Sequence, residues 1–199
     1  MRYMWRQICL HILYVFNTYI LREGGDILNE VNVLYKKYKD IEPEITCSMR
    51  KIEILHSVKM ENLNCRLKKK RDIEKKLQRP NTSWNLNELK DILRYTYVLP
   101  NSHFIRTAEE VISDIEKETG FKCFERKNYW DDDSVNYKGY NTEFTKDGLL
   151  FEVQFHTEES VYIRNISHGI YERKRKIEKN YDDINNLEKS LWNSVVGIN

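Results

Sequence analysis

The chain has 199 residues, of which 32% are charged and 12% are aromatic. This length suits one ordinary domain, and the aromatic content is too high for a wholly disordered chain. Because 33 basic residues are offset by 31 acidic ones, the net charge of +2 gives no general reason to expect a polyanionic partner. The position of the charges along the chain therefore matters more than their sum.

Several classes of site are excluded because their motifs are absent. The sequence contains no CxxC, HExxH or GxxxxGK[ST] pattern, so zinc-finger, zincin and P-loop sites are not expected. The four cysteines, at positions 9, 47, 65 and 123, lie far apart, and a chain of this size needs no disulfide to hold its core. We therefore expect free thiols and a cytoplasmic protein.

The N-terminal region carries an uncharged stretch, Ile8 to Leu21, which follows Arg2 and Arg6. The stretch is shorter than the ~20 residues that span a bilayer, and no small-x-small cleavage site follows it. We expect a helix that is buried or that contacts an antitoxin or another subunit, and no membrane span. A secretory signal is the alternative. Gly24 and Gly25 mark a break after this segment.

Helical and extended segments then alternate along the chain. Apolar residues at helical spacing predict two helices separated by Pro43, and Gly120 closes a later one. The expected helices are Asp26–Lys39, Glu44–Met60, Asp72–Gln78, Ile105–Thr119 and Glu158 to about Lys179. The expected extended segments are Leu63–Lys68, Asp91–Leu99 and Phe121–Arg126. Together with a hairpin, this order predicts an α+β (mixed α/β) domain in which helices cover a single mixed sheet.

The clearest local signal is that hairpin, formed by Tyr137–Thr145 and Leu149–Thr157. A three-residue loop, Lys146-Asp147-Gly148, suits a type I turn that closes with a left-handed residue. A two-residue loop would place Glu143 opposite Glu152, which is an unfavourable like-charge pair. Polar groups then gather on one face of the sheet, although a solvated hairpin face has the same pattern. The pairs expected from the three-residue loop are Thr142–Glu152, Tyr140–Gln154 and Lys138–His156.

A basic cluster occupies Arg66 to Arg79. It holds eight basic and two acidic residues, and eight minus two gives +6 within 14 residues. Such a density suits a polyphosphate or a nucleic acid, although a solvated basic helix has a similar composition. Asp91 and Glu152 lie on expected strands and could share Mg²⁺, which takes one or two carboxylates plus phosphate oxygens. Asp91 could equally be a turn residue.

These residues together resemble the synthetase domain of the RelA/SpoT family. The family pattern is RxKxxxSxxxK, a metal-binding Asp, a Gly-Tyr segment and an ExQxxT strand, and the order holds from about residue 44 to 175. Some of the local sequence is closer to that of short, phage-associated or toxin-like members of the family than to that of the long enzymes. The matching segments are Arg66-x-Lys68-x3-Asp72-x3-Lys76, Asp91, Lys138-Gly139-Tyr140 and Glu152-x-Gln154-x-His156-Thr157.

The resemblance implies a nucleotidyltransferase-like fold and transfer of the β,γ-pyrophosphate of ATP to the 3′-hydroxyl of a nucleotide. GDP or GTP is the first acceptor expected; the alternatives are an adenine nucleotide, the 3′ end of tRNA, or a catalytically impaired nucleotide-binding module. Glu152 and Asp91 would be catalytic and would hold Mg²⁺. The implied ATP-binding residues are Arg66, Lys68 and Lys76, and the implied acceptor-binding residues are Lys138, Tyr140 (by stacking), Gln154, His156, Thr157 and His168.

The chain also departs from the family pattern. Asp72 stands where the family usually has Ser, Arg94 stands where long members have a small residue, and Asn141 to Phe144 replaces the usual Ser-Leu-His ending. The sequence has no His-Asp dipeptide, so we expect synthesis without the hydrolase half of the long enzymes. The basic run Arg173–Lys176 could grip a tRNA acceptor stem, or be a solvated helix end. We expect a helical extension over residues 1–40, the synthetase domain over 41–180 and a polar tail over 181–199.

Overall fold

The structure is a computed structural model that describes the backbone of residues 2–77, 89–132, 134–174, 181–195 and 197–198. Side chains are described over the same ranges apart from residues 2–27, 146, 170–174 and 181–184. Three features of the sequence analysis therefore lie outside the described part. They are the apolar side chains of Ile8–Leu21, the end of the basic cluster beyond Leu77, and the side chains of the basic run Arg173–Lys176. Cys47, Cys65 and Cys123 are free thiols.

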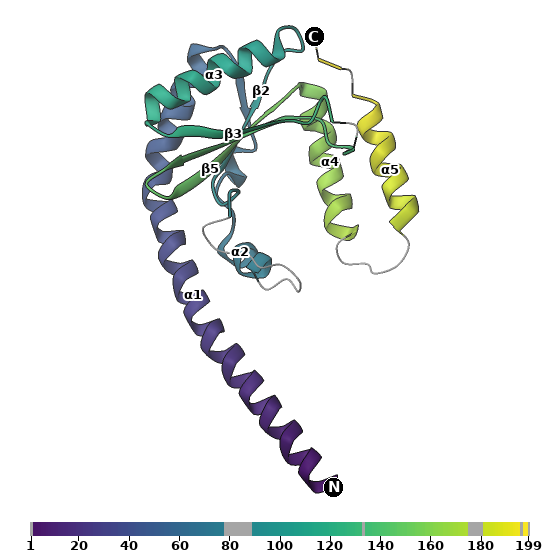
Figure 1. Cartoon of the computed structure of the whole chain (residues 1–199). Coiled ribbons are helices and arrows are strands. Elements are labelled where there is room, and N and C mark those ends of the chain that lie inside the picture. The colour runs from purple at the N-terminus through teal and green to yellow at the C-terminus, as the bar shows by residue number, and fades with distance from the viewer. Residues whose placement is uncertain (1, 78–88, 133, 175–180, 196, 199) are drawn as a thin grey trace.

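A five-stranded mixed sheet forms the centre of the molecule (Figure 1). Its order is β1-β2-β5-β4-β3, in which β2 and β5 are parallel and all other neighbours are antiparallel. The α+β class expected from the sequence is therefore confirmed. The strands are β1 (Lys59–Glu61), β2 (Arg94–Val98), β3 (Lys122–Asn128), β4 (Tyr140–Lys146) and β5 (Leu149–His156).

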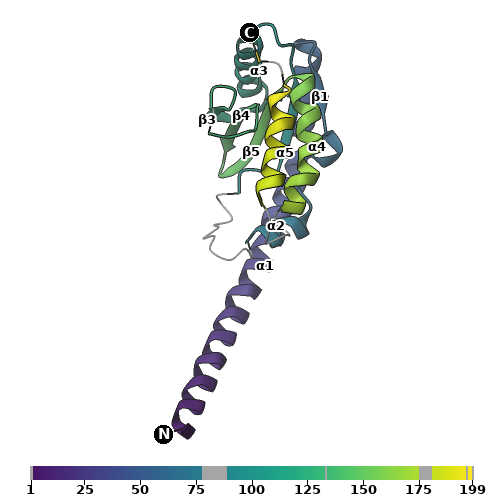
Figure 2. The ribbon, with the colours of Figure 1, turned by 90° about the vertical axis from the view of Figure 1, so that its right-hand side faces the viewer.

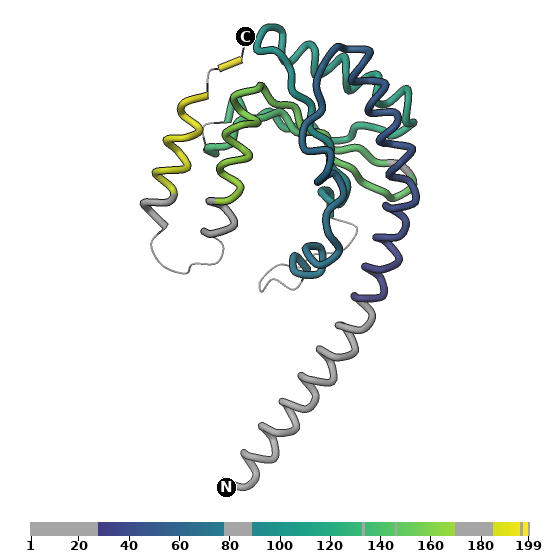
Figure 3. Tube along the Cα trace, turned by 180° about the vertical axis from the view of Figure 1, so that it is seen from behind, coloured from purple at the N-terminus to yellow at the C-terminus, as the bar shows by residue number. Residues whose placement is uncertain are grey.

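Helices cover the two faces of this sheet unequally. The long helix α1 (Arg2–Leu55) and α3 (Phe104–Thr119) share one apolar core with the aromatic side chains of β2, β4 and β5. A short 3₁₀ turn η1 (Leu63–Cys65) and α2 (Lys70–Leu77) follow β1. The pair α4 (Glu158–Lys174) and α5 (Tyr181–Asn193) lies side by side, away from α3 (Figures 2 and 3). No helix in the described ranges is both long and apolar enough to cross a membrane.

The prediction that Pro43 separates two helices is wrong, because α1 runs through it. Proline removes one backbone hydrogen bond and crowds the preceding turn, which costs about 3 kcal/mol in a helix interior. Pro43 is exposed, while buried side chains on both sides of it, including Tyr38 and Ile45, belong to the same core. Packing before and after the proline therefore outweighs the local penalty. Gly24 and Gly25 do not end the helix either.

Two other segments differ from expectation. The sequence predicts residues 59–60 at the end of a helix, but α1 stops at Leu55 and Ser57 adopts a left-handed conformation, with φ of 50°. The chain can then reverse, so that β1 pairs with β2. Leu63–Lys68, expected as extended, is instead the turn η1 followed by a single β-bridge from Leu67 to Leu93. Helix α5 forms where only a polar tail was expected.

The β4–β5 hairpin has the register that the sequence analysis rejected. Its loop has two residues, Asp147 and Gly148, with φ of 54° and 74°. Positive φ at both positions is the type I′ turn, whose twist matches that of the flanking strands, and Asp-Gly is a preferred sequence for it. The one-residue difference turns β4 over, because side chains alternate between faces. The observed pairs include Tyr140–Phe155, Asn141–Gln154, Thr142–Val153 and Glu143–Glu152.

Candidate active site

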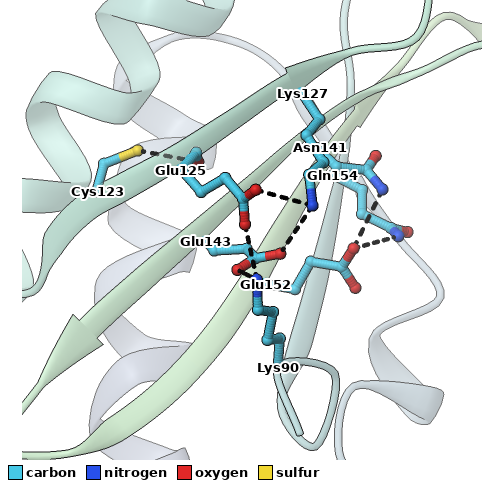
Figure 4. Close-up of polar contacts among 8 residues, drawn as sticks. All are labelled: Lys90, Cys123, Glu125, Lys127, Asn141, Glu143, Glu152 and Gln154. Atoms are coloured by element: carbon cyan, nitrogen blue, oxygen red, sulfur yellow. Dashed lines mark hydrogen bonds and ion pairs between the residues drawn. The ribbon is translucent and has the colours of Figure 1, made fainter. Parts of the chain in front are cut away.

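Three glutamates form a row across neighbouring strands on the face of the sheet away from α3 (Figure 4). Glu125 pairs with Glu143, and Glu143 pairs with Glu152, so this carboxylate row spans β3, β4 and β5. Lys90 offsets the repulsion, since its Nζ lies 2.7 Å from Glu125 and 2.5 Å from Glu143. Lys127 adds a second cation, 2.9 Å from Glu125. The like-charge contact that argued against this register is therefore neutralised by lysines.

Glu152 is the innermost member of the row. Its Oε1 accepts hydrogen bonds from Asn141 Nδ2 at 3.1 Å and from Gln154 Nε2 at 3.0 Å. No hydrogen bond to its second oxygen, Oε2, is made by the residues that the structure describes. Burial raises the pKa of Glu152 above its usual range, and Asp91 raises it further, although Arg94 opposes both. Glu152 thus combines one anchored oxygen, one open oxygen and a raised proton affinity.

Asp91 lies just before β2 and holds two lysines of the basic cluster. Lys68 Nζ donates to its Oδ2 at 2.5 Å, and Lys76 Nζ donates to its Oδ1 at 3.0 Å. Burial alone would raise the pKa of Asp91, but these two ammonium groups lower it to about 2. The structure therefore brings together three of the residues that the sequence analysis selected. It also keeps Asp91 ionised at neutral pH.

Two arginines complete the surroundings of Glu152, and neither was assigned to the site from the sequence. Arg94 pairs with Glu152 across the parallel β2–β5 ladder, and Arg164 comes from α4. Within the described part of the chain, neither guanidinium forms an ion pair with a carboxylate. Burial lowers the pKa of Arg164, and the charge of Arg94 lowers it further. Of the two, only Arg94 could have been noticed in the sequence, because long members of the family have a small residue at this position.

Two other basic residues have structural partners. Arg66 forms an ion pair with Glu42 of α1 and donates from Nη1 to the carbonyl oxygen of Leu63 at 2.8 Å. These contacts tie the first residues of the basic cluster to α1. Lys138 Nζ donates to the carbonyl oxygen of Trp130 at 3.2 Å. The binding roles of Arg66 and Lys138 stay predictions.

Tyr140 does not share a face with Glu152, so its expected position is wrong. It pairs with Phe155, is 5% exposed and donates its hydroxyl hydrogen to Glu109 of α3. The cause is the two-residue turn, which directs Tyr140 into the core between the sheet and α3. Asn141 takes the place beside Glu152 instead. A tyrosine in this position cannot stack on a base bound at Glu152.

The residues at the end of β5 form contacts inside the fold and do not lie on an open surface. His156 is fully buried, and its two ring nitrogens lie 2.8 Å from Tyr137 Oη and 2.9 Å from Ser160 Oγ. Thr157 caps α4: its Oγ1 accepts from the Ser160 N–H at 3.1 Å, while its own N–H donates to Ser160 Oγ at 2.9 Å. His168 lies farther along α4, with its side chain exposed. His156 and Thr157 therefore lie beneath the site.

Comparison with known proteins shows which fold carries this site. No protein-family model and no curated protein sequence matches the chain. Among solved structures, small alarmone synthetase 1 from Bacillus subtilis matches with a TM-score of 0.58 at 16% identity, over 85% of this chain and 90% of that chain. A structure of small alarmone synthetase 1 bound to its product pppGpp matches with a TM-score of 0.55 at 17% identity, over 81% and 87%.

A GTP pyrophosphokinase family protein from Streptococcus pneumoniae matches with a TM-score of 0.55 at 17% identity, over 79% of this chain and 86% of that one. The chain has the small alarmone synthetase fold. The expected likeness to a small, single-domain RelA/SpoT synthetase is thus confirmed at the level of the fold.

The expectation that Asp91 and Glu152 hold Mg²⁺ stays a prediction. No group of three or more His, Cys, Asp or Glu side chains could hold a metal ion, as far as the described residues show. Two carboxylates are enough when phosphate oxygens and water complete the coordination. Oε2 of Glu152 is open, whereas Lys68 and Lys76 occupy both oxygens of Asp91. The residues therefore fit a metal that binds together with a polyphosphate, rather than in a preformed cage.

Proposed function

We propose that the chain transfers the β,γ-pyrophosphate of ATP to the 3′-hydroxyl of a nucleotide, with GDP or GTP as the first acceptor. The observation that carries the proposal is the arrangement around Glu152. A half-buried carboxylate with a raised pKa lies within electrostatic reach of Asp91, an ionised group that holds two lysines just before β2, in a small alarmone synthetase fold. The related structure that contains pppGpp supports a guanine nucleotide as the acceptor.

The cations would bind the polyphosphate. Phosphoryl transfer depends on positioning and on neutralising charge at the phosphate oxygens, because the protein has little covalent chemistry to perform. Lys68 and Lys76 would exchange Asp91 for phosphate oxygens, and Arg94 and Arg164 would approach from the other side of Glu152. Mg²⁺ held by Asp91 and Glu152 would, when bound, neutralise charge on the same oxygens.

Glu152 would act as the general base. Its pKa is raised by burial, which brings its proton affinity closer to that of an effective base at neutral pH. The open Oε2 would take the proton of the acceptor 3′-hydroxyl. At the same time, a new bond would form between the 3′-oxygen of the acceptor and the β-phosphorus of ATP. The bond between the β-phosphorus and the oxygen that bridges the α- and β-phosphates breaks, and AMP leaves with this bridging oxygen. Asn141 and Gln154 hold Oε1 throughout.

An acceptor screen tests this function. The purified chain is incubated with labelled ATP, Mg²⁺ and either GDP, GTP, ADP or deacylated tRNA. We expect a pyrophosphorylated guanine nucleotide and an equal amount of AMP. Glu152→Gln should abolish the product, while Glu110→Gln, at an exposed position on α3, should leave it unchanged. Because burial raises the pKa of Glu152, the neutral glutamine should leave the free energy of unfolding equal or higher at pH 7.

The screen also separates the alternatives. Product on tRNA alone would replace the proposal by the toxin-like reaction, and product on ADP alone would make the chain an adenine-nucleotide pyrophosphokinase. Absence of product with every acceptor, from a folded chain, would overturn the proposal in favour of a nucleotide-binding module.

A further inference from the structure

A continuous hydrogen-bond chain runs from the first turn of α4 to Glu152. Ser160 Oγ lies 2.9 Å from His156 Nδ1, and His156 Nε2 lies 2.8 Å from Tyr137 Oη. Tyr137 donates its hydroxyl hydrogen to Asn141 Oδ1 at 2.8 Å, and Asn141 Nδ2 donates to Glu152 Oε1 at 3.1 Å. The proposed function uses none of the first three residues. Tyr137 was not selected from the sequence at all.

The direction of this chain follows from the hydrogen bond that Asn141 donates to the Glu152 carboxylate at its end. A carboxylate only accepts hydrogen bonds, so Asn141 must turn its amide nitrogen toward Glu152 and its oxygen toward Tyr137. That oxygen needs a donor, which uses the single hydroxyl hydrogen of Tyr137. His156 then donates from Nε2 and accepts at Nδ1 from Ser160 Oγ, whose single hydrogen has a shorter contact here, at 2.9 Å, than with the carbonyl oxygen of Thr157, at 3.3 Å. Each group in the chain thus has a donor or acceptor role that is consistent with its neighbours.

The surroundings keep these groups in place. His156 and Ser160 are fully buried, and burial lowers the pKa of His156 well below its usual value, so the ring is neutral. The ring of Tyr137 packs edge-on against Trp192 of α5, with centroids 5.3 Å apart. At Gly139, a Cβ atom would lie 2.7 Å from Tyr137 Oη, so the backbone passes closely beneath the hydroxyl. A dry, crowded setting of this kind strengthens hydrogen bonds and limits alternative geometries.

We propose that Tyr137 is a positioning residue which, through Asn141, fixes the orientation of the Glu152 carboxylate. His156 and Ser160 set the direction of its hydroxyl and so connect the site to the first turn of α4. The catalytic consequence rests on the proposed function, because an oriented Oε2 matters for a base that must meet the acceptor hydroxyl. The orientation itself does not depend on which nucleotide binds.

Kinetics of matched tyrosine variants test the catalytic consequence. Tyr137→Phe keeps the ring and removes the hydroxyl. Tyr129→Phe makes the same change on the ring that packs against it, 5.3 Å away, where no hydrogen bond to a described residue is lost. We expect Tyr137→Phe to lower kcat about 10-fold or more, as the loss of a partner that orients an active group does. KM for ATP and for the acceptor should stay the same. Tyr129→Phe should leave kcat unchanged.

A double variant separates positioning from a general effect on the fold. If Tyr137 acts through Asn141, then adding Tyr137→Phe to Asn141→Leu should lower kcat no further. Independent, multiplying effects on kcat would contradict the proposal. Equal kcat for Tyr137→Phe and the wild-type chain would also overturn it while leaving the proposed function intact.

Nuclear magnetic resonance tests the same chain without turnover. The assigned ¹⁵N signals of His156 should show a neutral ring protonated at Nε2, in the wild-type chain and in Tyr129→Phe. The side-chain amide of Asn141 should exchange slowly in the wild type and faster in Tyr137→Phe. A ring protonated at Nδ1, or an Asn141 amide that is indifferent to Tyr137→Phe, would overturn the inference even if no acceptor were ever turned over.

Discussion

Two carboxylates in one site have their proton affinities shifted in opposite directions. Two lysines hold the pKa of Asp91 at about 2, so this group is a permanent charge under physiological conditions. Burial raises the pKa of Glu152, where Arg94 and Arg164 only partly compensate. Such a separation of pKa values is how one site obtains a fixed anion and a proton acceptor from the same chemical group.

The pKa shift of Asp91 predicts a pH dependence of stability. A carboxylate whose pKa is lowered on folding stabilises the fold above its unfolded pKa of 3.8, and this contribution is lost as the pH falls toward 2. The stability advantage of the wild type over Asp91→Asn should therefore shrink by about 2 kcal/mol across this range. Urea unfolding in metal-free buffer at several pH values measures this. A constant difference between the two proteins would contradict the pairing with Lys68 and Lys76.

At the scale of elements, a two-residue turn decides which side chains of β4 reach the site. With Asp147 and Gly148 both left-handed, Asn141 and Glu143 lie beside Glu152, and Tyr140 lies in the core. A one-residue change of register would exchange the two sets. The local cost of placing Glu143 opposite Glu152 is met by Lys90, which approaches from before β2. The turn and the lysine together thus determine the composition of the site.

Glycine variants test the importance of the turn. Gly148 has φ of 74°, and an alanine there would meet no atom but would adopt an unfavourable backbone conformation. We expect Gly148→Ala to lower the free energy of unfolding by about 1 kcal/mol. Gly169→Ala is the control, because it lies in α4 with open space around it and should raise stability by up to about 1 kcal/mol. Equal effects of the two variants would argue against a strained turn.

At the scale of the whole molecule, the last helix completes the support of the site. Trp192 of α5 is 4% exposed and packs against Tyr137, which lies more than fifty residues earlier in the chain. Helix α5 itself packs beside α4, whose first turn holds His156 through Ser160. Both C-terminal helices therefore contact the hydrogen-bond chain to Glu152, α4 through Ser160 and α5 through Trp192.

Removal of this contact should loosen α5 selectively. Trp192→Ala deletes a large buried side chain, a change that costs about 3 kcal/mol or more where the surroundings cannot collapse. We expect the amide protons of α5 to exchange faster with solvent, while those of α3 and β2 keep their protection. Leu187→Ala is the matched control, because that side chain is 53% exposed on the same helix. Unchanged exchange in α5 of the Trp192 variant would show that the helix is held by other contacts.

Much of the fold could be predicted from local patterns. Helix α3 follows its apolar periodicity and ends at Gly120, whose φ of 68° matches the expected left-handed cap. The family resemblance selected Lys68, Lys76 and Asp91 for one site without predicting that they pair, and the alternation in β5 anticipated which of its residues face the core. These features depend on neighbours within a turn or a strand, so the sequence carries them directly.

Tertiary contacts decided the rest. Helix α1 continues through Pro43 because the core is packed on both sides of it, and Glu143 tolerates Glu152 because Lys90 arrives from another segment. The meeting of Arg94 with Arg164, and the chain from Ser160 to Glu152, join residues that are close only after folding. The amino-acid sequence by itself thus determined the fold class and the chemical groups present. Only the tertiary structure decided which groups share a face of the sheet with Glu152, because the face on which a side chain lies depends on strand register and long-range packing.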